Sequence, residues 1–144
     1  MLKAAIWYAK RDWPVLPCKG KVPLTRHGWQ DATVDPAIIA KWWERWPDAN
    51  VAIATGPAGL VVVDVDTKGD APGLDSWADL RRELDLQGET VTCETPTGGL
   101  HVYYRGNGHA IGCSTGELAP GLDVRAQGGI IIAPPSIHPN GGTY

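Results

Sequence analysis

The chain contains no long apolar run, and no hydrophobic stretch approaches the roughly 20 residues that a membrane helix needs. Its opening residues, MLKAAIWYAKRDWP, lack the apolar core and small-residue cleavage site of a secretion signal, so we expect a cytoplasmic protein with no membrane association. Internal repeats, low-complexity tracts and interdomain linkers are also absent. The 144 residues therefore predict one domain, spanning 1–144 and large enough to bury a core.

Cysteine is scarce as well. Cys18, Cys93 and Cys113 are isolated, and no pair has the CxxC spacing of zinc ligands. The pattern therefore indicates neither a disulfide framework nor a structural zinc site, and it favours small buried side chains in a reducing compartment.

The chain has no excess of positive charge. Its formal net charge of −3 counts against a simple nucleic-acid-binding module, which is usually basic. Residues 1–45 nevertheless hold eight Lys/Arg against four Asp/Glu, whereas the remainder holds five against twelve. This asymmetry suits an enzyme that contacts a polyanion with one face and metal ions with another, although ordinary surface charge explains it equally well.

The hydrophobic pattern predicts helices and strands without regular βαβ alternation, which indicates an α+β fold. Asp35-Pro36 is typical of a helix start, and Trp42, Trp43 and Trp46 follow at a helical spacing that favours the core over base stacking. We expect helices over residues 2–11, 36–46 and 75–85, and strands over 15–16, 51–54, 60–66, 90–95 and 101–105, with a hairpin formed by 122–126 and 130–133.

The strongest local signal is the run LVVVDVD, in which Asp64 and Asp66 end an apolar strand. Residues i and i+2 of a strand share a face, so both carboxylates would project together. Such a pair is best stabilised by a cation, and Mg²⁺ prefers oxygen ligands. The alternative is that both aspartates cap the turn into Thr67-Lys68-Gly69.

Two weaker signals follow. Gly98-Gly99 precedes His101, and consecutive glycines can present backbone N–H groups to a phosphate, although taken alone the pattern favours an ordinary turn. Asp123 is a candidate third carboxylate, and Arg125 shares its strand face. A hydroxyl and an imidazole, Ser136 and His138, lie beyond on a proline-stiffened loop, and the loop of residues 19–33 carries Lys19, Lys21 and Arg26.

The order LVVVDVD, TGGLH and GLDVR resembles the three motifs of archaeo-eukaryotic primases. It is most similar to the bifunctional primase–polymerase domain found in plasmids, phages and prophages. The flanking segments agree: PCKGKVP near the start, WPDANVAIATG before the first motif and PPSIH after the third. The resemblance covers nearly the whole chain and implies a primase-like catalytic core with a mixed or antiparallel sheet and flanking helices.

The resemblance implies template-directed nucleotidyl transfer, that is, a DNA primase and DNA polymerase acting in replication of a mobile element. Asp64, Asp66 and Asp123 would hold two Mg²⁺ or Mn²⁺ ions, and His101 with Gly98 and Gly99 would bind the nucleotide phosphates. Arg125, Ser136 and His138 are further nucleotide-binding candidates, and Lys19, Lys21 and Arg26 would meet nucleic-acid phosphates. The partners implied are a single-stranded DNA template and primer, nucleoside triphosphates, and a helicase domain or protein.

The sequence departs from the family pattern at two places. Leu100 stands where relatives often carry Arg or Lys before the histidine, and the chain stops at Tyr144 where relatives continue. We therefore expect a domain shortened at its C-terminal end.

Two other readings compete. Val63-Asp64-Val65-Asp66-Thr67 resembles the nucleophile motif of haloacid dehalogenase-type phosphatases, but about 60 residues precede it and no lysine follows Lys68. The second is a non-catalytic nucleotide- or DNA-binding remnant, against which the retained aspartates and His101 argue.

Overall fold

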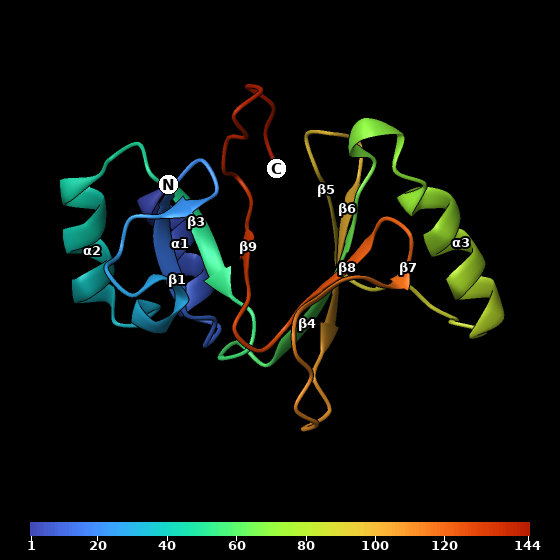
Figure 1. The fold of residues 1–144 in the computed structure, drawn as a ribbon. Coiled ribbons are helices and arrows are strands. Elements are labelled where there is room, and N and C mark those ends of the chain that lie inside the picture. The colour runs from blue at the N-terminus through green and yellow to red at the C-terminus, as the bar shows by residue number, and fades with distance from the viewer.

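The computed structural model describes residues 1–144 and contains two antiparallel sheets, each with helices of its own (Figure 1). The first sheet has the order β2 (Val22–Pro23), β1 (Val15–Lys19), β3 (Asn50–Ala54), β9 (Ile130–Ile132). The second has the order β5 (Thr92–Glu94), β6 (Leu100–Arg105), β4 (Leu60–Val65), β8 (Leu122–Arg125), β7 (Ser114–Ala119).

The first lobe consists of the first sheet with α1 (Leu2–Ala9) and α2 (Pro36–Arg45), and includes a 3₁₀ turn, η1 (Gly28–Asp31). The Asp35 carboxylate caps α2 by accepting a hydrogen bond from the Ala37 amide at 2.7 Å, as the sequence predicts. Both helices bury apolar side chains against β1 and β3, so this face of the sheet is closed to solvent.

The second lobe consists of the second sheet with α3 (Gly73–Glu83), which follows a short turn, η2 (Lys68–Asp70). Alternation along β4 decides what each face carries. Val63 and Val65 pack with Trp77 of α3, whereas Val62 and Asp64 point to the other face, toward the first lobe.

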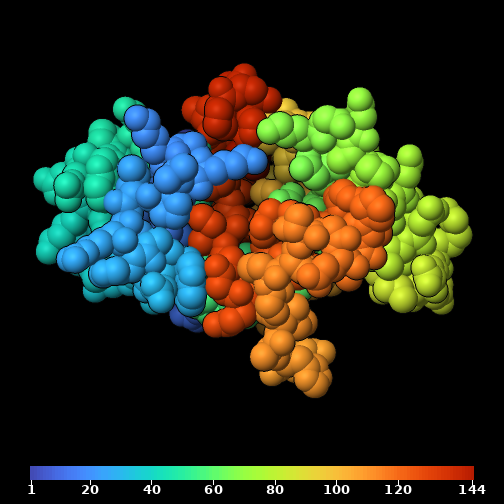
Figure 2. All heavy atoms as spheres, viewed as in Figure 1, coloured from blue at the N-terminus to red at the C-terminus, as the bar shows by residue number.

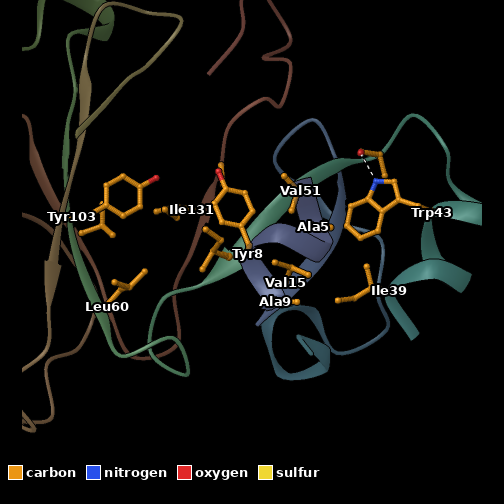
Figure 3. Close-up of a cluster of buried hydrophobic side chains, with 14 residues drawn as sticks. Ala5, Tyr8, Ala9, Val15, Ile39, Trp43, Val51, Leu60, Tyr103 and Ile131 are labelled. Atoms are coloured by element: carbon orange, nitrogen blue, oxygen red, sulfur yellow. Dashed lines mark hydrogen bonds between the residues drawn. The ribbon is translucent and has the colours of Figure 1, made fainter. Parts of the chain in front are cut away.

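The two lobes share one hydrophobic core (Figure 3). Leu60 and Tyr103 of the second sheet belong to the same buried cluster as Tyr8 and Ile131 of the first lobe. The chain passes from one sheet to the other twice, through residues 55–59 and 126–129. In the space-filling view the last residues, coloured red, lie between the lobes (Figure 2).

The α+β fold with antiparallel sheets and flanking helices is confirmed. The predicted hairpin of residues 122–126 and 130–133 is wrong, because β8 pairs with β4 whereas β9 pairs with β3 in the other sheet. The strand β7 was not predicted, since its sequence STGELA is largely exposed and shows no apolar alternation. No helix of the structure is long and apolar enough to cross a membrane.

Candidate functional site

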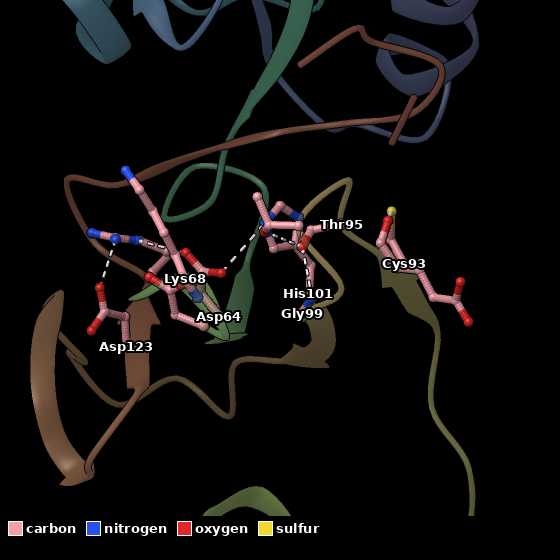
Figure 4. Close-up of polar contacts among 11 residues, drawn as sticks. Asp64, Lys68, Cys93, Thr95, Gly99, His101 and Asp123 are labelled. Atoms are coloured by element: carbon pink, nitrogen blue, oxygen red, sulfur yellow. Dashed lines mark hydrogen bonds and ion pairs between the residues drawn. The ribbon is translucent and has the colours of Figure 1, made fainter. Parts of the chain in front are cut away.

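The site lies on three neighbouring strands of the second sheet, β6, β4 and β8. Asp64 of β4 is the register partner of His101 on one side and of Asp123 on the other. Residues directly opposite each other in antiparallel strands project from the same face. Three segments that are far apart in the sequence therefore meet on the face opposite α3, as Figure 4 shows.

Arg125 connects the two carboxylates of the site. Its Nη2 donates to Asp123 Oδ2 at 2.8 Å, and its Nε lies 3.6 Å from Asp64 Oδ2. The other Asp123 oxygen, Oδ1, accepts a hydrogen bond from the Gly116 amide at 3.1 Å. Like charges opposite each other on a sheet destabilise it, so the guanidinium offsets a repulsion that the register would otherwise impose.

His101 is buried beside Asp64, with Nε2 3.5 Å from Asp64 Oδ1. Burial lowers the pKa of His101 below its ordinary value; the nearby Asp64 charge opposes this shift, and Lys21 and Arg125 add to it. Burial therefore favours the neutral imidazole. Its Nδ1 atom is buried and has no hydrogen-bond partner, which is a rare condition for a polar atom.

Asp66 does not join the other two carboxylates. The strand β4 ends at Val65, and the Asp66 side chain is exposed and accepts a hydrogen bond from the Lys68 amide at 2.8 Å. No three His, Cys, Asp or Glu side chains converge on a position that could hold a metal ion. In this structure Asp66 caps a turn, whereas Asp64 and Asp123 lie side by side on adjacent strands, and a metal site shared by all three stays a prediction.

The two carboxylates that lie side by side, Asp64 and Asp123, suit a divalent ion. Mg²⁺ is usually bound by one or two carboxylates and takes its other ligands from water and phosphates. Asp64 and Asp123 supply carboxylate oxygens on adjacent strands, and the cation Arg125 already lies against both.

The two glycines of the β5–β6 turn do not form a phosphate-binding loop. The Gly98 amide donates to the Thr95 carbonyl at 2.9 Å, and the Gly99 amide donates to Thr95 Oγ1 at 3.1 Å. Both donors are therefore taken. A Cβ atom on Gly99 would lie 2.1 Å from the carbonyl oxygen of Val65, so glycine is required there for close packing of the turn on β4.

Ser136 is also unavailable to a nucleotide. Its side chain is fully buried, and its hydroxyl accepts from the Val51 amide at 3.0 Å and donates to the Val51 carbonyl at 3.1 Å. Its function in the structure is to fasten the loop after β9 to β3. His138 lies in the same loop, where its Nδ1 accepts from the Asn140 amide at 3.2 Å.

Tyr144 was not predicted as part of the site. Its ring stacks on His101 with 5.7 Å between ring centroids, and the His138 ring lies 6.0 Å from it. Burial raises the pKa of Tyr144 to about 12, and the Asp64 and Cys93 charges add to the shift. Nothing in the sequence around residue 144 signals this contact, because it depends on the path of the chain after β9.

The predicted nucleic-acid contacts are exposed cations on the first lobe. Lys19 and Lys21 flank the turn between β1 and β2, and Arg26 follows in the next loop. Of the three, Lys21 is the one whose positive charge helps to lower the pKa of His101.

The turn is held by Asn50, a residue that the sequence analysis did not select. Its side-chain amide donates to the carbonyls of Gly20 at 3.0 Å and Ile137 at 2.7 Å. A polar residue within an apolar strand was the available signal, since such a buried group requires partners.

Residues 5–144 match the family model described as bifunctional DNA primase/polymerase, N-terminal. No curated protein shows significant sequence similarity to the chain.

Proposed function

Because the chain belongs to the bifunctional DNA primase/polymerase N-terminal family, we propose that Asp64, His101, Asp123 and Arg125 carry out template-directed nucleotidyl transfer. Family membership indicates DNA primase/polymerase activity, with DNA and nucleotides as substrates. The observation that supports the assignment to these residues is their placement side by side on β6, β4 and β8.

Asp64 and Asp123 would hold the divalent metal, Mg²⁺ or Mn²⁺. Two such ions, when bound, stabilise the attacking and the leaving oxygen of an in-line displacement. Asp66 would be a further ligand, and its Oδ2 is available for this because the Lys68 amide bonds only to Oδ1. Arg125, which lies against both carboxylates, would contact a phosphate of the nucleotide with its planar set of donors.

His101 would bind the triphosphate. A neutral imidazole has one N–H donor, and the buried, unpartnered Nδ1 gives this side chain an unused hydrogen-bonding position. The Gly98-Gly99 turn would act indirectly, by packing on β4 and fixing where β6 begins. His138 would act through Tyr144, which covers the His101 ring.

The wider setting is also part of the proposal. The substrates would be nucleoside triphosphates, a single-stranded template and a primer, in replication of a plasmid, phage or prophage with a helicase domain or protein as partner. The phosphatase alternative is disfavoured because the primase/polymerase family model covers residues 5–144.

The test is extension of a labelled primer on single-stranded DNA with Mg²⁺ or Mn²⁺. We expect Asp64→Asn to reduce incorporation by about a hundredfold or more, since loss even of a group that supports a metal ligand costs 10- to 100-fold. Chelation of the metal should abolish incorporation. The matched control is Asp70→Asn, which removes an exposed acid of the nearby η2 turn and should leave the rate unchanged.

Wild-type incorporation by a folded Asp64→Asn protein would contradict the assignment. Absence of incorporation by a folded wild-type protein that still binds DNA would instead support the non-catalytic binding alternative. Unprimed templates then determine whether the enzyme starts chains or only extends them.

A further inference from the structure

A groove runs over the first lobe between the β1–β2 turn and the C-terminal end of α2. It consists of two adjoining cavities of about 710 and about 580 Å³, which share Leu24, Arg45 and Trp46 as lining residues. We call it the α2 groove; its lining includes the cations Lys19, Arg26 and Arg45 and the aromatic side chains of Trp42 and Trp46.

We propose that the α2 groove binds the single-stranded DNA template, an inference that rests on the proposed function. Its three cations, Lys19, Arg26 and Arg45, are exposed and form no ion pair with an acidic side chain. Two acids, Asp31 and Asp48, also line the groove, and the Asp31 carboxylate accepts hydrogen bonds from the His27 amide at 2.8 Å and the His27 ring at 2.9 Å. With three cations against two carboxylates, the groove has a small positive excess in a chain of net charge −3, which is complementary to phosphate.

The groove also offers an aromatic surface. The Arg45 guanidinium lies 4.6 Å from the centre of the Trp46 ring, and Trp42 and Trp46 pack on the core of the first lobe, so both rings are held in place. Proteins that bind single strands without regard to sequence combine cations along the backbone with aromatic rings on which bases stack. The helical spacing predicted that these tryptophans pack in the core. Trp42 and Trp46 do so only in part, because both are partly exposed, and a base would stack on the exposed part.

The groove leads to the candidate active site. Lys19 and Gly20 line it, and the Asn50 side chain fixes their turn through the Gly20 carbonyl. Ile137 and Pro139 line it as well, and the ring of His138, which lies between them in the chain, is 6.0 Å from the Tyr144 ring that stacks on His101. A strand lying in the groove would therefore pass beside the loop that reaches the candidate active site.

The experiment measures binding of a fluorescein-labelled oligo(dT) to the full chain by anisotropy, without nucleotide, over a range of salt concentrations. We expect Arg26→Gln/Arg45→Gln to weaken binding at least tenfold at low salt. The slope of log K against log salt should fall in magnitude by about 1.4, that is, about 0.7 for each of two lost phosphate contacts. Trp46→Leu should weaken binding about tenfold with little change in slope.

The matched control is Lys10→Gln, an exposed cation of the first lobe that lines neither cavity. Thermal melts establish that each variant is folded. If Trp46→Leu does not fold, Arg26→Gln/Arg45→Gln still tests the proposal, because it changes only exposed side chains.

Binding by Arg26→Gln/Arg45→Gln with wild-type affinity and slope would overturn the proposal and leave the groove to another occupant, such as a protein segment. The Asp64→Asn protein separates this inference from the proposed function. It should bind oligo(dT) as the wild type does and yet fail to incorporate nucleotides. If the groove variants lose binding while Asp64→Asn incorporates nucleotides normally, template binding in the α2 groove is supported. The assignment of catalysis to Asp64 is then refuted.

Discussion

Arg125 lies between two carboxylates that the sheet register places opposite each other. Asp64 and Asp123 are cross-strand partners, and each is about a quarter or less exposed, so water screens their repulsion incompletely. The guanidinium meets Asp123 at 2.8 Å and Asp64 at 3.6 Å. The site therefore contains its own counter-charge, the guanidinium of Arg125.

Replacing Arg125 by Met should destabilise the metal-free protein by about 1 kcal/mol, because the repulsion between Asp64 and Asp123 is then uncompensated. If these carboxylates hold a divalent ion, Mg²⁺ should raise the melting temperature of Arg125→Met more than that of the wild type. Calorimetric melts with and without Mg²⁺ measure both effects. Arg82→Met, which removes an exposed cation paired with Asp79, is the control, and equal Mg²⁺ shifts in all three proteins would argue against a metal at this pair.

At the scale of elements, the β5–β6 turn positions His101 through its contact with β4. Gly99 lies so close to the Val65 carbonyl that no side chain fits, whereas both turn amides are satisfied by Thr95. The turn thus sets the position at which β6 begins beside β4.

Gly99→Ala should destabilise the protein by about 3 kcal/mol, since its Cβ would lie 2.1 Å from a backbone oxygen and either the turn or the strand has to move. Denaturant unfolding measures the loss. Gly112→Ala is the matched control, because a Cβ there meets nothing within 4 Å and its φ is not positive; its stability should change little. A Gly99→Ala protein as stable as the wild type would mean that the turn does not rest on β4.

Local sequence patterns are sufficient to predict individual helices and strands, but they do not show which strands pair. Asp64, His101 and Asp123 follow or lie within apolar strands, so their candidacy could be recognised. The Asp35 cap was predicted for the same local reason. The apolar segments around Gln127-Gly128-Gly129 resemble a hairpin locally, yet their true partners β4 and β3 lie more than 55 residues earlier. Likewise, the hydrogen bond that turns Asp66 away from Asp64 depends on where β4 ends.

At the scale of the whole molecule, the shared core makes the two lobes depend on each other. Ile131 of β9 is buried in the cluster that also contains Leu60, Val62 and Tyr103 of the second sheet. Each sheet therefore needs the other to bury the side chains of this cluster.

Ile131→Ala should therefore destabilise both lobes at once, by about 2–5 kcal/mol. Trp77 is the only tryptophan after residue 46, so fluorescence reports mainly on the first lobe, whereas far-UV circular dichroism reports on both. We expect the two denaturation curves to coincide in the wild type and in Ile131→Ala. The control Val22→Ala, at a side chain 68% exposed, should not shift them. Separated transitions would show that the lobes unfold independently.

The two passages of the chain between the sheets are bonded to each other. The Thr55 amide donates to the Gly129 carbonyl at 3.1 Å, its hydroxyl donates to the Ala126 carbonyl at 2.7 Å, and Gly56 lies against Gln127. A pair of joined crossings acts as one rigid connection between the sheets. Together with the shared core, it fixes the alignment of the face bearing Asp64 relative to the first lobe.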